Sequence, residues 1–199
     1  KTNEKPEPQP QQVTDWPAPL DLLELSTREP SAPDSIIDEW FPQGEATLLA
    51  GHGGSGKSII ALHISACVSV GHPWGDLHTQ KRKVLFISAE DPAGVLHWRL
   101  QRIAAHMNVP LESFDGALDV LDVSSLDVEL MAETREGAFL TAVYGTLRER
   151  IQATGAQVLV LDGVSDLFGA NEIVRRHVRR FVRGLRRLIP ADGAVLLLA

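Results

Sequence analysis

The 199-residue sequence contains a single cysteine and no long apolar run, and each absence excludes a class of protein. Cys67 alone can form neither an intramolecular disulfide framework nor a cysteine-based zinc site, and one free thiol fits a reducing compartment. No apolar run reaches the roughly 18 residues of a membrane-spanning helix, and the polar N-terminal segment lacks the apolar core of a signal peptide. The formal net charge of −7 argues against a uniformly basic nucleic-acid-binding surface but does not exclude a local basic site. We therefore expect a soluble, cytoplasmic protein with no membrane partner.

The two ends of the sequence differ in composition from its middle. Residues 1–20 are rich in proline, glutamine and charge, and cannot bury enough apolar surface to offset the entropy lost on ordering. We expect a disordered tail or linker over 1–20 and one α/β domain over 21–199. The last five residues, VLLLA, are all apolar and carry no polar cap or turn. We therefore expect the domain to be truncated at its C-terminal end.

Short apolar runs alternate with segments of helical periodicity. Strands are predicted over residues 46–50, 84–88, 117–121, 157–161 and 194–198. All but 117–121 are almost continuously apolar, as parallel strands covered on both faces should be, so 117–121 is expected nearer a sheet edge. Helices are predicted over residues 57–70, 93–107, 136–154 and 172–189. Asp91 is the expected N-cap of the second helix, with Pro92 at its first position. This alternation predicts a three-layer α/β domain with a mostly parallel central sheet.

The first predicted strand runs directly into a phosphate-binding motif. The residues are Gly51-His52-Gly53-Gly54-Ser55-Gly56-Lys57-Ser58, which match the pattern GxxxxGK[ST] at every fixed position. Glycines let the backbone N–H groups close around phosphate oxygens, and the positive end of the following helix points at the same anion. Lys57 is expected to reach the β- and γ-phosphates of ATP, and the Ser58 hydroxyl to coordinate Mg²⁺. The residues expected to bind the nucleotide are Gly51, Gly53, Gly54, Ser55, Gly56, Lys57, Ser58 and Ile59.

Two carboxylates are candidates for the rest of the site. Asp162 ends the apolar run Val158–Leu161, as in the Walker B pattern, and is expected to hold Mg²⁺; a helix or turn cap is the alternative. Gly163, not glutamate, follows it, so a hydrolase needs its general base elsewhere. Glu90 lies just beyond the second predicted strand, where the carboxyl ends of parallel strands line a ligand crevice. Glu90 could there orient a water molecule for attack, or it could cap the next helix instead.

These elements together resemble the RecA-like class of P-loop ATPases, and most closely the RepA-like ATPases of plasmids and phages. The resemblance is carried by LLAGHGGSGKS at 48–58, by ISAEDP at 87–92 and by VLVLDGVSDLFGANE at 158–172, and it spans residues 36–199. It implies a three-layer RecA-like P-loop NTPase fold. In that class a γ-phosphate sensor stands at the tip of the fifth strand, so we expect the sensor beyond residue 199.

The same resemblance implies roles for single residues. It assigns catalysis to Lys57 and Glu90 and the Mg²⁺ ion to Ser58 and Asp162. Arg99 follows the second motif on a helix, and the resemblance places it near phosphate or at a subunit interface. A solvated Arg99 beside its helical neighbours is an equally supported alternative.

An arginine-rich helix follows the Walker B run. Residues 171–187 contain seven arginines and one acid, a local charge of +6. One hypothesis is a solvated face whose arginines pair with acids of the domain body. The others are a face between protomers, with an arginine finger, and a track for single-stranded DNA. Phe168, in the preceding loop, is expected to pack or to touch a base.

The resemblance implies an Mg²⁺-dependent ATPase that forms a homo-oligomeric, hexameric ring and moves along single-stranded DNA in plasmid or phage replication. One alternative is a nucleotide-gated assembly or loading module with little hydrolysis. Another is a small-molecule P-loop kinase, which needs an arginine-rich lid. The regular apolar stripe of the arginine-rich helix argues for a packed helix and against such a lid.

Overall fold

The computed structural model describes residues 17–199, which divide into two units. Residues 33–199 form one compact unit, and the preceding segment, up to Ala32, forms the other. The described part of that segment contains α1 (Leu22–Ser26), whose N-cap Asp21 accepts hydrogen bonds from the backbone of Leu23 and Glu24; no α1 residue is buried. Most of the predicted tail lies outside the described residues, and residues 17–20 are exposed. The division falls after residue 32, whereas we expected the domain to begin at residue 21.

The core of the larger unit is a five-stranded sheet in which every neighbouring pair is parallel. Its spatial order is β3 (Ala46–Leu49), β10 (Ala194–Leu198), β8 (Val158–Asp162), β4 (Val84–Ser88) and β5 (Leu118–Asp122). The five predicted strands are confirmed, with their ends within one residue of the predicted ones. β5 lies at an edge and is only partly buried, whereas every residue of β4, β8 and β10 is buried. The edge position predicted for β5 is confirmed. The expectation that the almost continuously apolar run at 46–50 is covered on both faces is wrong, because β3 lies at the other edge of the sheet and Leu48 is 58% exposed.

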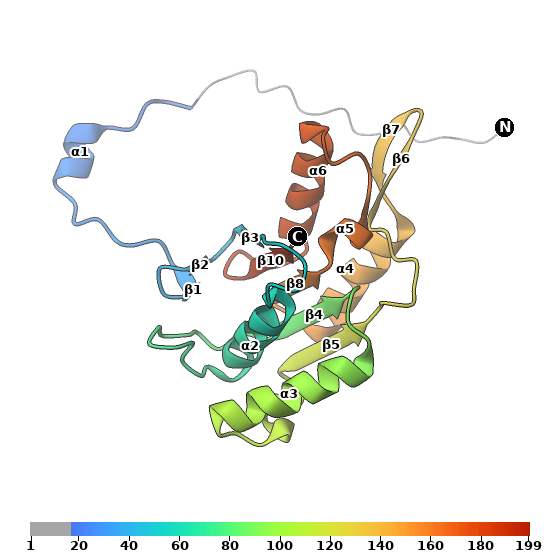
Figure 1. The fold of residues 1–199 in the computed structure, drawn as a ribbon. Helices are drawn as coiled ribbons and strands as arrows, with labels where there is room; N and C mark the ends of the chain where they lie inside the picture. Colours follow the sequence, from blue (N-terminus) through green and yellow to red (C-terminus); the bar gives the residue numbers. More distant parts are fainter. Residues whose placement is uncertain (1–16) are drawn as a thin grey trace. The chain divides into compact units, whose positions relative to one another are not determined.

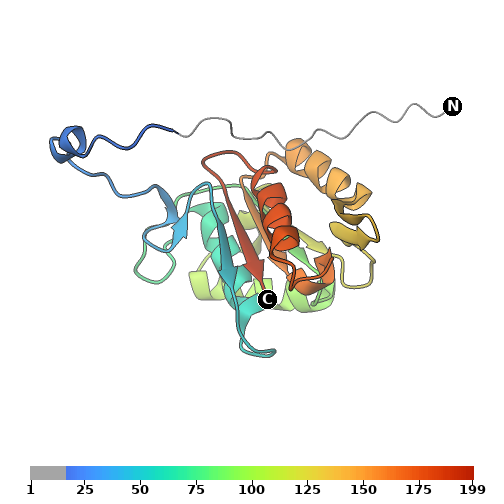
Figure 2. The ribbon, with the colours of Figure 1, turned by 90° about the horizontal axis from the view of Figure 1, so that it is seen from above.

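Helices cover both faces of this sheet (Figures 1 and 2). The helices are α2 (Lys57–Val70), α3 (Ala93–Met107), η1 (Leu111–Phe114), α4 (Ala142–Thr154), α5 (Val164–Leu167) and α6 (Arg175–Arg186). α2 and α3 pack on strand residues that include Phe86 and Val160. α4 and α6 pack on their chain neighbours Leu85 and Leu159. Successive residues of a strand point to opposite faces, so both faces are buried and the predicted three-layer α/β fold is confirmed. No helix within residues 17–199 is long and apolar enough to cross a membrane.

Two small sheets complete the unit. β1 (Ser35–Ile37) and β2 (Phe41–Pro42) form an antiparallel pair. β7 (Gly137–Leu140), β6 (Met131–Thr134) and β9 (Phe168–Gly169) form a three-stranded sheet in that order.

The predicted helix over 136–154 is wrong in its first six residues. β6 and β7 form an antiparallel hairpin with Thr134 opposite Gly137, so only two residues make the turn. Within β7, buried Ala138 alternates with Phe139, whose exposure is 40%, which is strand periodicity. Thr141 is the N-cap of α4, and its hydroxyl accepts a hydrogen bond from the Tyr144 backbone at 3.4 Å. The apolar residues from Phe139 onward have helical spacing, so the change from strand to helix periodicity was not evident in the sequence.

The start of α3 is also not as predicted. Pro92 is the N-cap residue and has no side-chain acceptor, and the side chain of Asp91 pairs with Arg99 instead of capping the helix. The Ala93 N–H donates to Oδ2 of Asp122, at the end of the neighbouring strand β5, at 2.7 Å. The cap therefore comes from a residue distant in sequence.

The arginine-rich helix is shorter than the predicted range of 172–189. Val174 is its N-cap, Arg187 its C-cap, and Leu188 and Ile189 are buried beyond its end. Phe181 and Leu185 bury one side of α6 against the sheet, so α6 is a packed helix, as its apolar stripe indicated.

Candidate active site

The loop between β3 and α2 has a backbone that only glycine adopts readily at two positions. Gly54 and Gly56 have φ angles of +75° and +87°, and Gly56 is the N-cap residue of α2. No side chain caps the first turn of α2. The N–H groups of this turn are therefore open to an anion, on which the positive end of the 14-residue helix also acts.

Lys57 lies across this loop. Its Nζ donates hydrogen bonds to the carbonyl oxygens of Gly51, at 2.7 Å, and His52, at 3.2 Å. The ammonium group is thus held where the loop carbonyls converge. Its expected contact with the β- and γ-phosphates stays a prediction.

Ser58 and Asp162, which are 104 residues apart, meet at the carboxyl end of the sheet. The Ser58 hydroxyl donates to Oδ1 of Asp162 at 2.9 Å. Asp162 is only 1% exposed, and its Oδ2 has no hydrogen-bond partner within residues 17–199. A buried carboxylate oxygen without a partner is unfavourable, and a divalent cation would supply the missing interaction. The Ser58 hydroxyl and the Asp162 carboxylate are therefore suitable oxygen ligands for Mg²⁺.

The environment of Asp162 disfavours its ionised form. Burial raises its pKa to about 6, and the nearby carboxylates of Glu90 and Asp91 add to the increase. The hydrogen bond from Ser58 and the positive charge of Arg99 act in the opposite direction. A bound cation would favour the ionised form of Asp162 and so offset the cost of burying it.

Glu90 lies beside Asp162 at the same end of the sheet. Ser88 is in register with Asp162 across the β4–β8 pair, and the Ala89 N–H donates to the Asp162 backbone oxygen at 2.9 Å. The Glu90 side chain is exposed, and its Cγ lies 2.9 Å from where a Cβ on Gly163 would stand. The first N–H of α3 donates to Asp122 and not to Glu90. The alternative prediction, that Glu90 caps α3, is therefore wrong.

The structure explains why residue 163 is a glycine, which the sequence did not reveal. Its φ angle is +84°, and a Cβ here would collide with Glu90 and crowd Ala89. In the sequence, Gly163 is notable only because a glutamate does not stand there. Its positive φ angle and the lack of room for a Cβ beside Glu90 both favour glycine at this position.

Arg99 is not the solvated side chain of the alternative prediction. It forms an ion pair with Asp91, and both side chains are largely buried, at 23% and 17% exposure. Ser88, which is fully buried, accepts a hydrogen bond from the Asp91 N–H at 2.9 Å. Sequence reasoning missed this support, although a serine at the end of the apolar run VLFIS was a usable signal. The structure places Arg99 near Asp162 and does not test a contact with phosphate.

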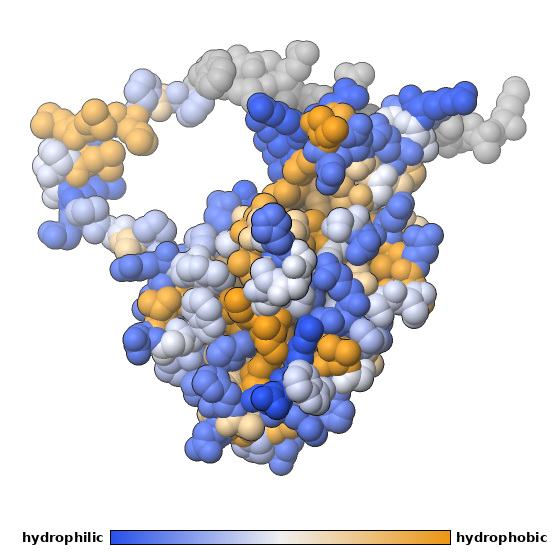
Figure 3. Space-filling view, viewed as in Figure 1, coloured by the Kyte–Doolittle hydropathy of each residue, from blue (hydrophilic) through white to orange (hydrophobic). Residues whose placement is uncertain are grey.

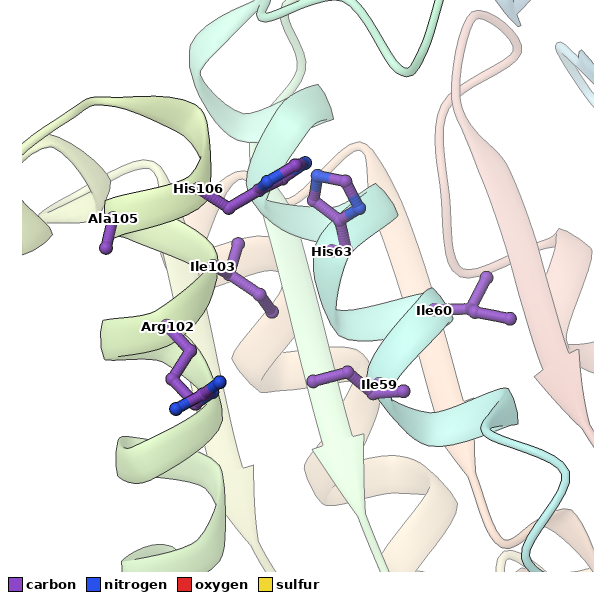
Figure 4. Close-up of a pocket in the computed structure, with 7 residues that line it drawn as sticks. All are labelled: Ile59, Ile60, His63, Arg102, Ile103, Ala105 and His106. Atoms are coloured by element: carbon purple, nitrogen blue, oxygen red, sulfur yellow. The ribbon is translucent and has the colours of Figure 1, made fainter.

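A hollow of about 540 Å³ lies between α2 and α3 (Figure 4). Its lining residues are Ile59, Ile60, His63, Arg102, Ile103, Ala105 and His106. The rings of His63 and His106 are in contact edge to face, with centroids 5.5 Å apart and an angle of 73° between the ring planes. Burial, followed by the neighbouring His106 and His72, lowers the pKa of His63, so its neutral form is favoured. The hollow begins at Ile59, one of the residues expected to bind the nucleotide.

Phe168 has a packing role. Its ring packs against Phe181 at a centroid distance of 5.0 Å, which is the packing alternative of the sequence analysis. The contact ties the loop after β8 to α6.

The comparison with protein families gives one match. A family model described as an AAA domain matches residues 8–199. The match covers the whole compact unit, including the phosphate loop, Glu90 and Asp162.

Proposed function

The chain belongs to the family of AAA domains, and on this premise we propose that it binds ATP with Mg²⁺ and hydrolyses it at the carboxyl end of the central sheet. Nucleotide binding of the ATPase type follows from the family. The single observation that carries the proposal is the hydrogen bond between Ser58 and the buried Asp162, whose Oδ2 has no hydrogen-bond partner within residues 17–199.

Each side chain of the site has a task in this proposal. Lys57 and the open N–H groups of the loop and of α2 bind the phosphates. Ser58 and Asp162 hold Mg²⁺, which when bound neutralises charge that develops on the phosphates. Glu90 orients the attacking water and accepts its proton, and the Asp91–Arg99 pair positions the segment that carries Glu90.

Two substitutions test these assignments. Lys57→Ala should abolish ATP binding, whereas Glu90→Gln should keep binding and lose turnover by a factor of about 100 or more. Glu112→Gln, an exposed glutamate on η1, is the matched control and should behave like the wild type. Binding is measured by titration with a fluorescent ATP analogue, and turnover by phosphate release. Retained hydrolysis in Lys57→Ala, or in Glu90→Gln, would contradict the corresponding assignment.

The hollow of Figure 4 is the proposed place for the nucleoside part of ATP. It shares Ile59 with the expected nucleotide-binding residues, and the first turns of α2 form one of its walls. Its isoleucines suit the flat face of a base.

The proposed biological role is that of a ring-forming translocase on single-stranded DNA, of the RepA-like type, in plasmid or phage replication. Its support is the resemblance of the three motifs. We expect the protein to form a homo-oligomer, hexameric by resemblance, in the presence of ATP, and single-stranded DNA to stimulate hydrolysis. Light scattering for the mass in solution, and phosphate release with added oligonucleotide, test both expectations. Nucleotide-dependent assembly without turnover would favour a loading module instead.

A further inference from the structure

The solvent side of α6 carries a dense set of positive charges, most of which form no ion pair within residues 17–199. Its arginines are Arg175, Arg176, Arg179, Arg180, Arg183, Arg186 and Arg187, and all seven are exposed. Only Arg186 forms an ion pair within residues 17–199, with Glu45 at 3.0 Å. The hypothesis that this face pairs with acids of the domain body is therefore wrong for six of the seven.

These arginines surround a concave surface. A hollow of about 730 Å³ is lined by six of the seven arginines together with Leu140, Tyr144 and Gly184. Two neighbouring hollows share arginines with it, Arg176 and Arg180 on one side and Arg183 and Arg187 on the other. We call the three together the α6 groove. Hydrophilic residues gather over this part of the molecule (Figure 3).

Hydrogen bonds connect α6 to the residues of α4 and β7 that lie beside the arginines. The Tyr144 hydroxyl donates to the Gly184 carbonyl at 2.8 Å, which ties α4 to α6. Arg180 donates to the Ala138 carbonyl on β7. Tyr144 and Leu140 present a ring and an apolar side chain next to the guanidinium groups. Positive charge and apolar surface thus alternate over a short distance.

The length of the groove favours a polymer over a single small anion. The arginines extend over twelve residues of helix, which is about 18 Å at 1.5 Å per residue. The positive charges are all guanidinium groups, which bind phosphate in a bidentate manner. Glu136 is the one acid among the lining residues of the groove. A polynucleotide offers evenly spaced phosphates beside base faces, whereas the carboxylates of an acidic protein surface have no regular spacing.

We propose that the α6 groove binds the phosphate backbone of single-stranded DNA. The inference rests on the proposed function only in the choice of DNA as the polymer. The groove does not include the phosphate loop or either acid of the nucleotide site, so the binding does not require nucleotide.

The test compares two double substitutions that remove the same charge. Arg179→Gln with Arg183→Gln changes two exposed groups of the groove that form no ion pair within residues 17–199. Arg135→Gln with Arg150→Gln is the control, since both arginines are exposed and lie outside the groove. Binding of a fluorescein-labelled oligothymidine of about 20 nucleotides is measured by anisotropy without nucleotide, from about 50 to 200 mM NaCl. Circular dichroism and the thermal midpoint show whether each variant is folded.

The groove variant should bind about tenfold more weakly than the wild type, and the slope of log affinity against log salt should decrease by about 1.4, or 0.7 for each lost phosphate contact. The control variant should stay within about twofold of the wild type. Equal losses in both variants, no loss in either, or no binding by the wild type would overturn the inference. Competition by an oligoglutamate of equal charge, as effective as by unlabelled oligonucleotide, would also overturn it in favour of an acidic protein partner.

A further variant separates this inference from the proposed ATPase. Lys57→Ala should lose ATP binding and keep the oligonucleotide binding of the wild type. A wild-type chain that binds the oligonucleotide but hydrolyses no ATP would contradict the proposed function and leave the groove inference standing. A chain that hydrolyses ATP but fails the groove test would contradict the groove inference and leave the proposed ATPase function standing.

Discussion

Asp162→Asn should change how the stability of the metal-free protein depends on pH. In the wild type the buried carboxyl group is protonated below its raised pKa of about 6, and the unfolded chain has an ordinary aspartate pKa of 3.8. Between these values the folded state binds more protons than the unfolded state, so the free energy of unfolding falls as pH rises. Asparagine cannot ionise and lacks this dependence.

The size of the effect follows from the difference between the two pKa values. About two pKa units, at about 1.4 kcal/mol each, correspond to about 3 kcal/mol. The variant should therefore gain about 3 kcal/mol relative to the wild type between pH 4 and pH 6, and nothing more above pH 6. Burying the asparagine amide has a cost that does not vary with pH. This cost changes the free energy of unfolding of the variant equally at pH 4 and pH 6, so the expected change of about 3 kcal/mol between these pH values stays the same.

The assay is urea unfolding at several pH values in buffer with a chelator. Asp122→Asn provides a control of opposite sign, because hydrogen bonds from Ser124 and Ala93 lower the Asp122 pKa and make its contribution grow as pH rises. Added Mg²⁺ should reduce the difference between Asp162→Asn and the wild type at pH 7.5. A difference between the two proteins that does not vary with pH would refute the argument from burial.

Three other substitutions or treatments test separate parts of the structure. Gly163→Ala should destabilise the protein by about 1–3 kcal/mol in urea unfolding, and should lower ATP turnover, because a Cβ there is strained and displaces Glu90; an unchanged stability would contradict the assigned backbone. Cys67 is fully buried and its pKa is raised to about 11, so DTNB should react with it at pH 8 only after unfolding, and rapid labelling of the native protein would show that α2 is more open than described. Ile60→Asn should weaken ATP binding several-fold while leaving inorganic tripolyphosphate binding unchanged, and equal losses for both ligands would place the nucleoside elsewhere.

The parts of the fold that the sequence predicted well have local signals. The five strands are apolar runs, and α2 and α3 begin and end at the predicted residues, because burial on both faces or on one stripe leaves a regular pattern. Ser58 and Asp162 were both assigned to Mg²⁺ from local patterns, the GxxxxGK[ST] motif and the apolar run that ends in Asp162.

The parts that the sequence predicted poorly depend on contacts between distant residues. The α3 cap comes from Asp122, 29 residues away from Ala93, and no local pattern announces it. Residues 136–140 could satisfy either helical or strand spacing, and the pairing with β6 decided between them. Within residues 17–199, Arg186 is the one α6 arginine that forms an ion pair, and this too is a property of the folded surface and not of the sequence around α6.

The position of β10 has a consequence for how the protein reaches its native state. β3 has β10 as its one neighbour in the central sheet, and β10 follows the other four strands of this sheet in the sequence. The strand that carries the glycine loop therefore cannot join the sheet until residues 194–198 insert between it and β8. Because such distant pairings form late, nucleotide-binding competence should be among the last properties acquired during folding.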